Sequence, residues 1–371
     1  MTSEICHELT AAGLSLWLDD LDRGRIPDGL NALIAGSGIS GVTTNPTIFD
    51  RALRSGANAY HAQLDELAKQ DVTIDEAIRV ITTDDVRAAC DVFQATWESS
   101  GGVDGRVSIE VDPRLAHDVD ATVHQAIDLW NLVDRPNAMI KIPATVEGLA
   151  AIPQVIGRGI SVNVTLIFSI ERYQGVMDAY ADGLRRAQDA GVDLTSIESV
   201  ASFFVSRVDT SVDALLDSNP TPASTHLRGK AAIANARLAW LAHQEYLRTP
   251  IWTELARAGA RPQRPLWAST GVKDKRYDAT RYVLGLVAPG CVNTLPESTL
   301  IAVREYSQFR GITIMSDAPE CHQVLDDLAA SGIDLGTVCE QLETDGVKAF
   351  VDSWHALRAT VAERLGKSEE L

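Results

Sequence analysis

The 371-residue sequence has few cysteines, no ligand spacing for a metal and no long apolar run, and each shortage excludes a class of protein. Its five cysteines are scattered and never form a CxxC pair, which indicates reduced thiols rather than a disulfide framework or a zinc site. The eight histidines show no HxxxH or HExxH spacing, so no metal is predicted. No segment reaches the roughly 18 apolar residues that a membrane-spanning helix needs.

Positive charge is also scarce. The formal net charge is −18, and only seven of the 33 basic residues are lysines. Such a surface repels nucleic acid and anionic lipid, so neither is expected as a partner. The N-terminus has no basic start followed by an apolar run, which predicts a cytoplasmic protein without a secretory signal. An anionic substrate would require a few cations gathered in its pocket.

Short β-rich runs alternate with longer helical patterns along the chain, which is typical of an α/β protein with parallel strands. The predicted strands lie near Leu14–Leu18, Gly41–Thr44, Val107–Val111, Ala138–Ile142, Val162–Phe168, Ser199–Phe204, Leu266–Ser269 and Val292–Leu295. Apolar residues at helical spacing predict helices over Ser55–Lys69, Asp75–Val80, Asp84–Ser99, His117–Val133, Ile170–Ala190 and His226–Arg248, and in a largely helical C-terminal part over Asp326–Ala330, Val338–Leu342 and Val347–Leu365.

Eight strands with helical crossovers and no second set of strands predict a closed (β/α)8 TIM barrel rather than an open sheet. We expect residues 1–371 to form one barrel domain. Additional helices are expected in residues 50–105, 208–265 and 300–371.

Reactive side chains of such a barrel lie at the C-terminal ends of its strands. Lys141 is the strongest candidate, because strand alternation places Met139 and Lys141 on the face opposite Ile140 and Ile142. In a barrel that face is the interior, where burial disfavours an ammonium group and leaves a neutral amine able to attack a ketone. The alternative is a lysine at an edge strand with its amine in water.

Other polar residues follow the same strand ends, and each has a structural alternative. Asp19 could equally cap the next helix, and Asn45 before Pro46 is an ordinary helix entry. A carboxylate at Glu110 would be costly in a strand interior unless it is hydrogen-bonded. The remaining candidates are Thr43, Asn163, Thr165, Ser202 and Ser269, together with Arg207 and Lys273, which are either solvated charges or a phosphate clamp.

Six motifs occur in order over about residues 10 to 310, and together they resemble transaldolase, most closely the long form of actinobacteria and similar bacteria. The motifs are WLDDL, GVTTNPTIF, SIEVDPR, MIKIPAT, VNVTLIFS and LWASTGVKD. The resemblance implies a class I aldolase barrel that needs no cofactor. Such an enzyme moves a dihydroxyacetone unit from sedoheptulose 7-phosphate or fructose 6-phosphate to glyceraldehyde 3-phosphate or erythrose 4-phosphate, in the non-oxidative pentose phosphate pathway.

The resemblance also assigns roles to the candidates. Lys141 would form the Schiff base, Asp19 would be the acid and base at the C4 hydroxyl, and Glu110 would act with Thr165 through a water. The substrate-binding residues would be Asn45, Asn163 and Ser202 at the hydroxyl groups, Thr43 and Phe204 along the pocket, and Arg207 at the phosphate.

One motif departs from the family. The usual Ser-Phe-Arg after the seventh strand is here Ser269-Thr270-Gly271, so the second phosphate cation would be Lys273 or Lys275. Ser206 also stands where glycine is common. Two rivals remain: a Schiff-base aldolase that releases free dihydroxyacetone from fructose 6-phosphate, and a non-catalytic sugar-phosphate-binding barrel. The sequence leaves a monomer or a homodimer open.

Overall fold

The computed structural model describes residues 3–55, 57–218, 220, 222–305, 308–314 and 318–367 of the chain. Within them, eight parallel strands close into a barrel in sequence order, with β8 pairing to β1. The strands are β1 (Ser15–Leu18), β2 (Ile39–Val42), β3 (Arg106–Glu110), β4 (Ala138–Pro143), β5 (Val162–Ile167), β6 (Ser199–Phe204), β7 (Arg264–Ala268) and β8 (Val292–Leu295). The predicted (β/α)8 fold is confirmed.

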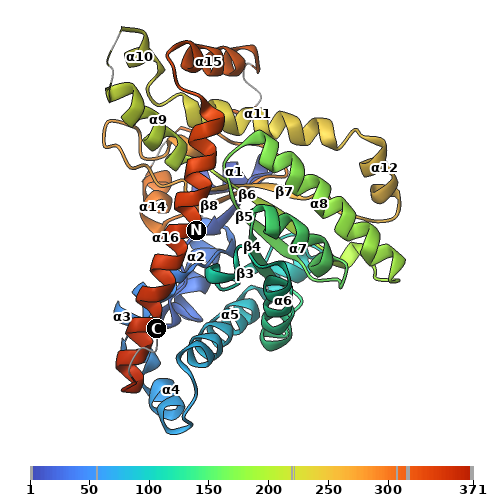
Figure 1. Ribbon diagram of the computed structural model, residues 1–371, viewed down its shortest axis with the longest axis vertical. Helices are drawn as coiled ribbons and strands as arrows, with labels where there is room; N and C mark the ends of the chain where they lie inside the picture. Colours follow the sequence, from blue (N-terminus) through green and yellow to red (C-terminus); the bar gives the residue numbers. More distant parts are fainter. Residues whose placement is uncertain are drawn as a thin grey trace.

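Helices surround this barrel (Figure 1). Up to β5 they are α1 (Glu4–Ala11), η1 (Arg23–Arg25), α2 (Asp28–Ser37), α3 (Pro46–Ser55), α4 (Ala57–Lys69), α5 (Ile74–Ser99), η2 (Pro113–Leu115), α6 (Val119–Val133) and α7 (Val146–Ile156). After β5 they are α8 (Ile170–Asp189), η3 (Leu194–Ser196), α9 (Ser206–Ser218), α10 (Pro222–Leu227), α11 (Ala231–Tyr246), α12 (Pro250–Arg257), α13 (Arg281–Leu284), α14 (Glu297–Glu305), α15 (Ala318–Ala330) and α16 (Leu335–Leu365). Of the predicted helix Ser55–Lys69, position 56 lies outside the described residues.

Two helices that were predicted as separate pieces are continuous. Helix α5 spans the predicted break between Val80 and Asp84. The hydroxyl groups of Thr82 and Thr83 donate to the carbonyls of Ile78 and Arg79, so both buried hydroxyls are satisfied within the helix. Helix α5 begins at a capping box in which Thr73 and Glu76 bond to each other's backbone N–H groups.

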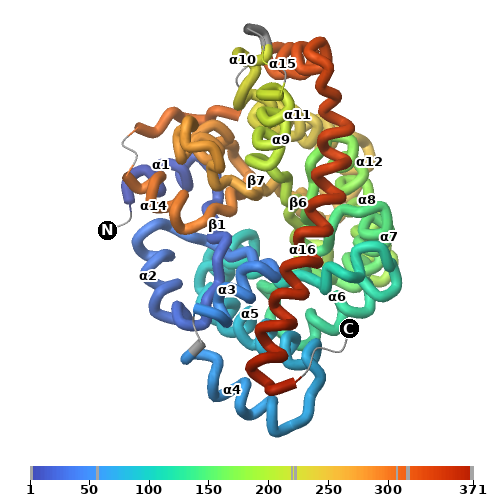
Figure 2. The backbone as a smooth tube through the Cα atoms, turned by 60° about the vertical axis from the view of Figure 1, so that its left-hand side comes forward, coloured from blue at the N-terminus to red at the C-terminus, as the bar shows by residue number. Residues whose placement is uncertain are grey.

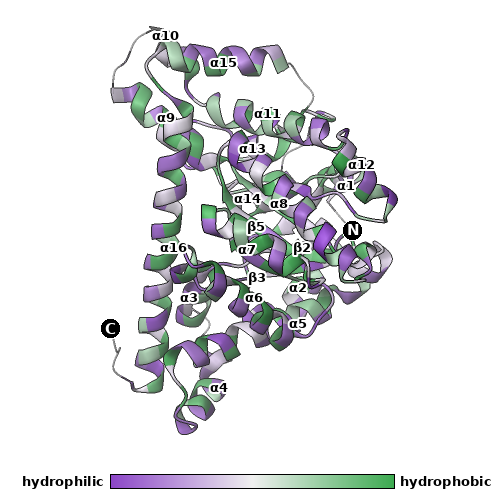
Figure 3. Cartoon of the chain, turned by 45° about the vertical axis from the view of Figure 1, so that its right-hand side comes forward, coloured by the Kyte–Doolittle hydropathy of each residue, from purple (hydrophilic) through white to green (hydrophobic). Residues whose placement is uncertain are grey.

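Helix α16 is the second continuous helix, and it crosses the mouth of the barrel. It spans the predicted break between Leu342 and Val347 and packs against α3, α5 and α9 (Figure 2). Figure 3 shows hydrophilic and hydrophobic residues alternating along it, as expected of a helix with one covered face. A side chain at Gly346 would meet Leu166 Cδ2 at 3.0 Å, so the missing side chain lets α16 approach the end of β5.

The predicted helix His226–Arg248 is, in contrast, divided into α10 and α11. Gly229 stands between them with φ +66, and a Cβ there would lie 2.7 Å from the Tyr277 ring. Its N–H donates to Asp213 Oδ1. The turn therefore needs glycine, and it ends the periodic pattern that had favoured one helix.

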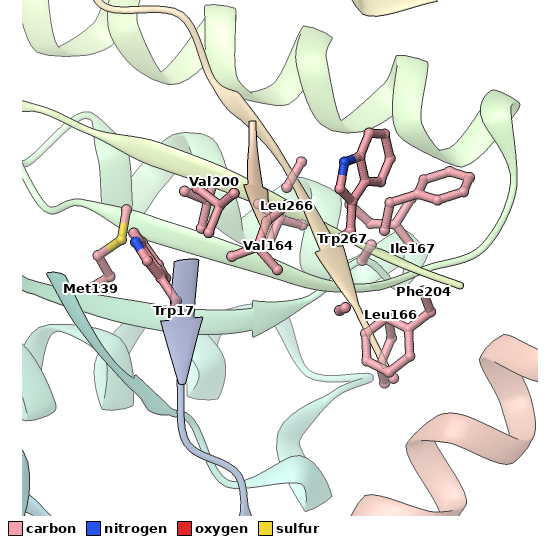
Figure 4. Close-up of a cluster of buried hydrophobic side chains, with 14 of the residues drawn as sticks. Trp17, Met139, Val164, Leu166, Ile167, Val200, Phe204, Leu266 and Trp267 are labelled. Atoms are coloured by element: carbon pink, nitrogen blue, oxygen red, sulfur yellow. The ribbon is translucent and has the colours of Figure 1, made fainter. Parts of the chain in front are cut away.

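Large apolar side chains fill part of the barrel interior below the mouth. Trp17 of β1 and Met139 of β4 are fully buried and lie beside each other in Figure 4. A Cβ at Gly41 of β2 would lie 2.7 Å from the Trp17 ring, so glycine makes room for the indole. Alternate residues of a strand face the same side. The residues two positions after Trp17 and Met139 therefore also face the barrel interior, one layer nearer to its mouth.

Candidate active site

The barrel mouth holds a cavity of about 310 Å³, which we call the Lys141 cavity. Most of the predicted site residues line it, namely Asp19, Thr43, Asn45, Lys141, Thr165, Ser202, Phe204, Arg207, Ser269 and Lys273. Asp19 and Lys141 follow Trp17 and Met139 by two positions, as the alternation requires. Glu110 and Asn163 do not line this cavity but contact residues that do.

Lys141 lies inside the barrel, and the alternative of an edge lysine in water is wrong. Its side chain is 6% exposed, and Nζ donates to the backbone oxygen of Thr44 at 3.1 Å. The carboxylate oxygen Oε2 of Glu110 is 3.2 Å from Nζ, and the Phe350 ring of α16 has its centroid 5.5 Å away. The amine therefore contacts a carboxylate and an aromatic ring inside the barrel.

Glu110 is buried beside the lysine. Burial raises the pKa of its carboxyl group to about 6, although the Lys141 charge lowers it. Apart from this ion pair, Oε2 has no hydrogen-bond partner among the described residues, and neither does the buried hydroxyl of Thr165. Two polar atoms therefore lie near Lys141 with bonding capacity left for a water or a ligand.

Asp19 is half-buried at the end of β1. Its Oδ1 accepts a hydrogen bond from the Thr43 hydroxyl at 3.0 Å, and that hydroxyl is 2.7 Å from the Thr294 hydroxyl of β8. Burial raises the pKa of the Asp19 carboxyl, while the Lys141 charge and the Thr43 hydrogen bond act in the opposite direction. A carboxyl held in this way, with a raised pKa, suits a group that both takes and returns a proton.

The amide side chains differ in position. Asn45 Oδ1 accepts from the Ile48 N–H at the start of α3, which leaves the Nδ2 group for a ligand in the Lys141 cavity. Its helix-entry role and its site role are thus compatible. Asn163 is fully buried below the cavity, donating to Ser108 Oγ and accepting from Ser202 Oγ at 2.7 Å. It orients Ser202.

Cations gather at one side of the cavity. Arg207, at the start of α9, stacks on Phe204 with 5.2 Å between the guanidinium carbon and the ring centroid. Burial lowers its pKa, and it has no ion-pair partner among the described side chains. Lys273 is exposed on the rim, whereas Lys275 does not line the cavity. Of the two predicted alternatives, the structure therefore places Lys273 at the site.

The loops that carry these residues are joined to each other. Ser269 directly follows β7 with φ 54, and its hydroxyl is 3.0 Å from the hydroxyl of Ser206. The Ser206 N–H also donates to the Ser269 carbonyl. Serine in place of the usual glycine thus links the loop of Arg207 to the loop of Lys273.

The sequence analysis missed several lining residues, of which Arg51 and Phe350 bear most directly on the chemistry. Arg51 of α3 reaches the cavity and pairs with Asp20, and Phe350 covers Lys141 from α16. Arg51 lies less than two turns beyond Asn45-Pro46, and that helix entry was the available signal. Phe350 had no local signal, because only the course of α16 brings it to the mouth.

The described part of the chain also bears on metals and membranes. Across residues 3–367, apart from the gaps named above, no group of three or more His, Cys, Asp and Glu residues is arranged to hold a metal ion. Among the same residues, no helix has the length and apolar character to cross a membrane.

Known proteins resemble the chain over nearly its whole length. A family model described as Transaldolase/Fructose-6-phosphate aldolase matches residues 16–361. A protein of Mycolicibacterium smegmatis named Transaldolase is 56% identical over 350 residues, which cover 94% of each chain. A protein of the same name from Saccharopolyspora erythraea is 53% identical over 369 residues, which cover 99% of this chain and 100% of the relative. Another from Thermobifida fusca is 55% identical over 362 residues, which cover 97% of this chain and 98% of the relative. These matches agree with the resemblance found in the motifs, and the chain belongs to the transaldolase/fructose-6-phosphate aldolase family.

Proposed function

We propose that the chain catalyses the transaldolase reaction, with Lys141 as the Schiff-base lysine. The observation that carries the proposal is the buried amine at the barrel mouth, 3.2 Å from the Glu110 carboxylate and within the same cavity as Asp19. The names of the relatives support the reaction class. The substrates are then sugar phosphates, a ketose phosphate as donor and an aldose phosphate as acceptor.

The first half of the reaction uses these groups in turn. The neutral Lys141 amine attacks the ketone carbon, and the carbinolamine loses water to give an iminium ion, with Glu110 and Thr165 handling the proton and the water. Asp19 takes the proton of the C4 hydroxyl, and the C3–C4 bond breaks. Its electrons move into the iminium ion, so an enamine forms instead of a free carbanion.

The second half reverses these steps on a new aldehyde. The enamine carbon attacks the acceptor, Asp19 returns its proton to the new alkoxide, and water releases the product from Lys141. Phe350 and α16 cover the amine from the solvent side, which favours transfer over early hydrolysis. The cover over Lys141 therefore favours a transaldolase over an aldolase that releases free dihydroxyacetone.

Binding of the substrate is divided between two sides of the cavity. We assign the dihydroxyacetone hydroxyls to Asn45 and Ser202, with Asn163 positioning Ser202. Thr43 and Phe204 form part of the wall. The phosphate is assigned to the cationic side, with Arg207, Ser269 and Lys273 as its contacts. A cytoplasmic location and a monomer or homodimer remain proposals from the sequence.

Borohydride reduction tests the proposal. In the presence of fructose 6-phosphate, reduction should leave a dihydroxyacetone-derived mass on the peptide that contains Lys141. Lys273 is the matched internal control, because it lines the same cavity but is exposed, and it should stay unmodified. Lys141→Met should abolish the adduct. An unmodified Lys141 peptide under turnover conditions would refute Schiff-base chemistry and would favour the non-catalytic binding barrel.

A further inference from the structure

A second cavity reaches Glu110 without being lined by Lys141. It has a volume of about 250 Å³ and lies among α3, α5, α6 and α16, and we call it the Glu110 cavity. Glu110 lines this cavity, Lys141 lines the other, and the two charged groups are 3.2 Å apart. Asn45 lines both cavities. The ion pair therefore stands between two separate spaces.

The Glu110 cavity extends from the surface to the buried carboxyl group. Glu76, in the first turn of α5, is exposed and lines its outer part, whereas Glu110 is buried at its inner end. Between them, the walls carry polar groups such as Thr82 and Gln125, next to the apolar Leu129. A passage of this size, with polar groups along it, has the room and the hydrogen-bond partners that water needs.

The charge of the two cavities differs. The Glu110 cavity is lined by the carboxyl groups of Asp75, Glu76, Glu110 and Asp112, and among the described residues that line it Arg79 is the one cation. The Lys141 cavity is lined by four cations and by the carboxyl group of Asp19: its cations are Arg51, Lys141, Arg207 and Lys273. Asp75 and Asp112 are paired with Arg114 and Arg358, so the difference between the cavities lies in the cations that each offers to a ligand. The Lys141 cavity offers a sugar phosphate dianion four cations and the Glu110 cavity offers one, so the phosphate favours the first, whereas water can enter either.

Two residues that line the Glu110 cavity carry buried polar atoms without a hydrogen-bond partner among the described residues. Oε2 of Glu110 has its ion pair with Lys141 and no hydrogen-bond partner among the described residues. Nε1 of Trp354, a residue of α16 that also lines the Glu110 cavity, is buried and without a partner in the same part of the chain. Buried polar groups of this kind are ordinarily satisfied by ordered water.

We propose that the Glu110 cavity is the water path of the reaction, separate from the entrance used by the sugar phosphate. The inference rests on the proposed Schiff-base function. In dehydration, the protonated Glu110 gives its proton to the carbinolamine hydroxyl, the C–O bond breaks, and the nitrogen lone pair forms the C=N bond. The products are the iminium ion, the Glu110 carboxylate and one water, which leaves through the Glu110 cavity. Hydrolysis follows the same path in reverse.

Blocking the path tests this inference. Thr82→Leu on α5 and Leu129→Phe on α6 place extra side-chain volume in the Glu110 cavity from two walls, and neither residue lines the Lys141 cavity. The control is Thr83→Leu, the same substitution at the next position of α5, where the threonine is buried but does not line either cavity. The readout is the rate at which fructose 6-phosphate exchanges its C2 oxygen with ¹⁸O-labelled water, measured beside KM on variants with wild-type circular dichroism.

Thr82→Leu and Leu129→Phe, which we call the plug variants, should each slow oxygen exchange by about tenfold and leave KM within about twofold of wild type. Thr83→Leu should keep the wild-type exchange rate. Exchange at the wild-type rate in a folded plug variant would overturn the inference, since water would then pass through the substrate entrance. An equal rise of KM in both plug variants would overturn it too. Borohydride trapping distinguishes failure of this inference from failure of the proposed function. Absence of a Lys141 adduct in the wild type would refute the Schiff-base function. A Lys141 adduct together with unchanged oxygen exchange in the plug variants would refute only the water path.

Discussion

The Phe350 ring lies over the amine of Lys141, with 5.5 Å between Nζ and the ring centroid, although the two residues come from the last helix and the fourth strand. The ring is 5% exposed and forms part of the wall of the Lys141 cavity. Helix α16 therefore completes the site that the barrel strands begin. An enamine formed on Lys141 would lie beneath an apolar cover rather than in open solvent.

Removal of that cover should shift the reaction from transfer to hydrolysis. Phe350→Ala opens the mouth above Lys141, so water and stray protons reach the enamine before the acceptor does. We expect the ratio of transfer product to free dihydroxyacetone to fall by about tenfold. Product analysis with fructose 6-phosphate and erythrose 4-phosphate measures it. Phe350→Leu, which keeps an apolar cover, is the control, and an unchanged ratio in Phe350→Ala would show that α16 does not protect the intermediate.

Arg207 should decide affinity for phosphorylated donors. It is unpaired among the described side chains, faces the Lys141 cavity and is held against Phe204, so it can bind a phosphate without breaking another ion pair. A charge-assisted hydrogen bond contributes about 1.5–3 kcal/mol, so Arg207→Ala should raise KM for fructose 6-phosphate by about 10- to 100-fold. Binding of unphosphorylated dihydroxyacetone should change far less.

The matched control is Arg186→Ala on α8, an arginine paired with Asp182 on the exposed surface. It should leave both KM values near wild type. If Arg207→Ala weakens dihydroxyacetone and fructose 6-phosphate equally, the arginine supports the cavity wall and does not bind phosphate. Lys273→Ala gives a third comparison and should have a smaller effect, since Lys273 is exposed.

Strand alternation made the inner half of the site predictable. The two-residue repeat of a strand puts Lys141 on the same face as Met139 and on the opposite face from Ile140. This assignment requires no information from outside the strand. Boundaries were less accurate. The second strand was predicted over Gly41–Thr44 but spans Ile39–Val42, because the Thr44 hydroxyl bonds to the Ser108 carbonyl instead of extending a strand.

Elements fixed by distant packing were not predictable in the same way. The sequence around Gly346 favoured a break in the helix, and only the contact with Leu166 explains why a continuous helix passes there. Helix α7 was not predicted either, and it contains Pro153, a residue that ordinarily breaks a helix. The cover by Phe350 depends on the whole course of α16, so it could not be read from neighbouring residues.

Asp19 should be needed for bond cleavage but not for attachment of the substrate. Asp19→Asn removes the base for the C4 proton while it keeps a side chain of similar shape beside Thr43. General base catalysis is worth about 10²- to 10⁴-fold, so kcat should fall by that factor. Borohydride reduction of the variant with fructose 6-phosphate should then trap the intact hexose phosphate on Lys141. Asp22→Asn, which alters a capping residue in the same loop, is the control, and a dihydroxyacetone-sized adduct that forms in Asp19→Asn as fast as in wild type would refute the assignment.

The buried carboxyl group of Glu110 should make stability depend on pH in a defined window. Its pKa rises from 4.5 to about 6 on folding, so the folded chain binds its proton more tightly than the unfolded chain does. The resulting stabilisation is fully present below about pH 4.5 and is lost as the pH rises through about 6. One pKa unit corresponds to about 1.4 kcal/mol, so the loss is about 2 kcal/mol.

Glu110→Gln removes this dependence, because the amide does not titrate. The free energy of unfolding of the variant, measured by urea denaturation and compared with wild type at each pH, should therefore improve by up to about 2 kcal/mol between about pH 4.5 and about pH 6.5. Above that window the difference should stay level, since Glu110 is then ionised in both states of the wild type. A difference that is constant from about pH 4.5 to about pH 6.5 would mean that the Lys141 charge offsets the whole cost of burying this carboxylate.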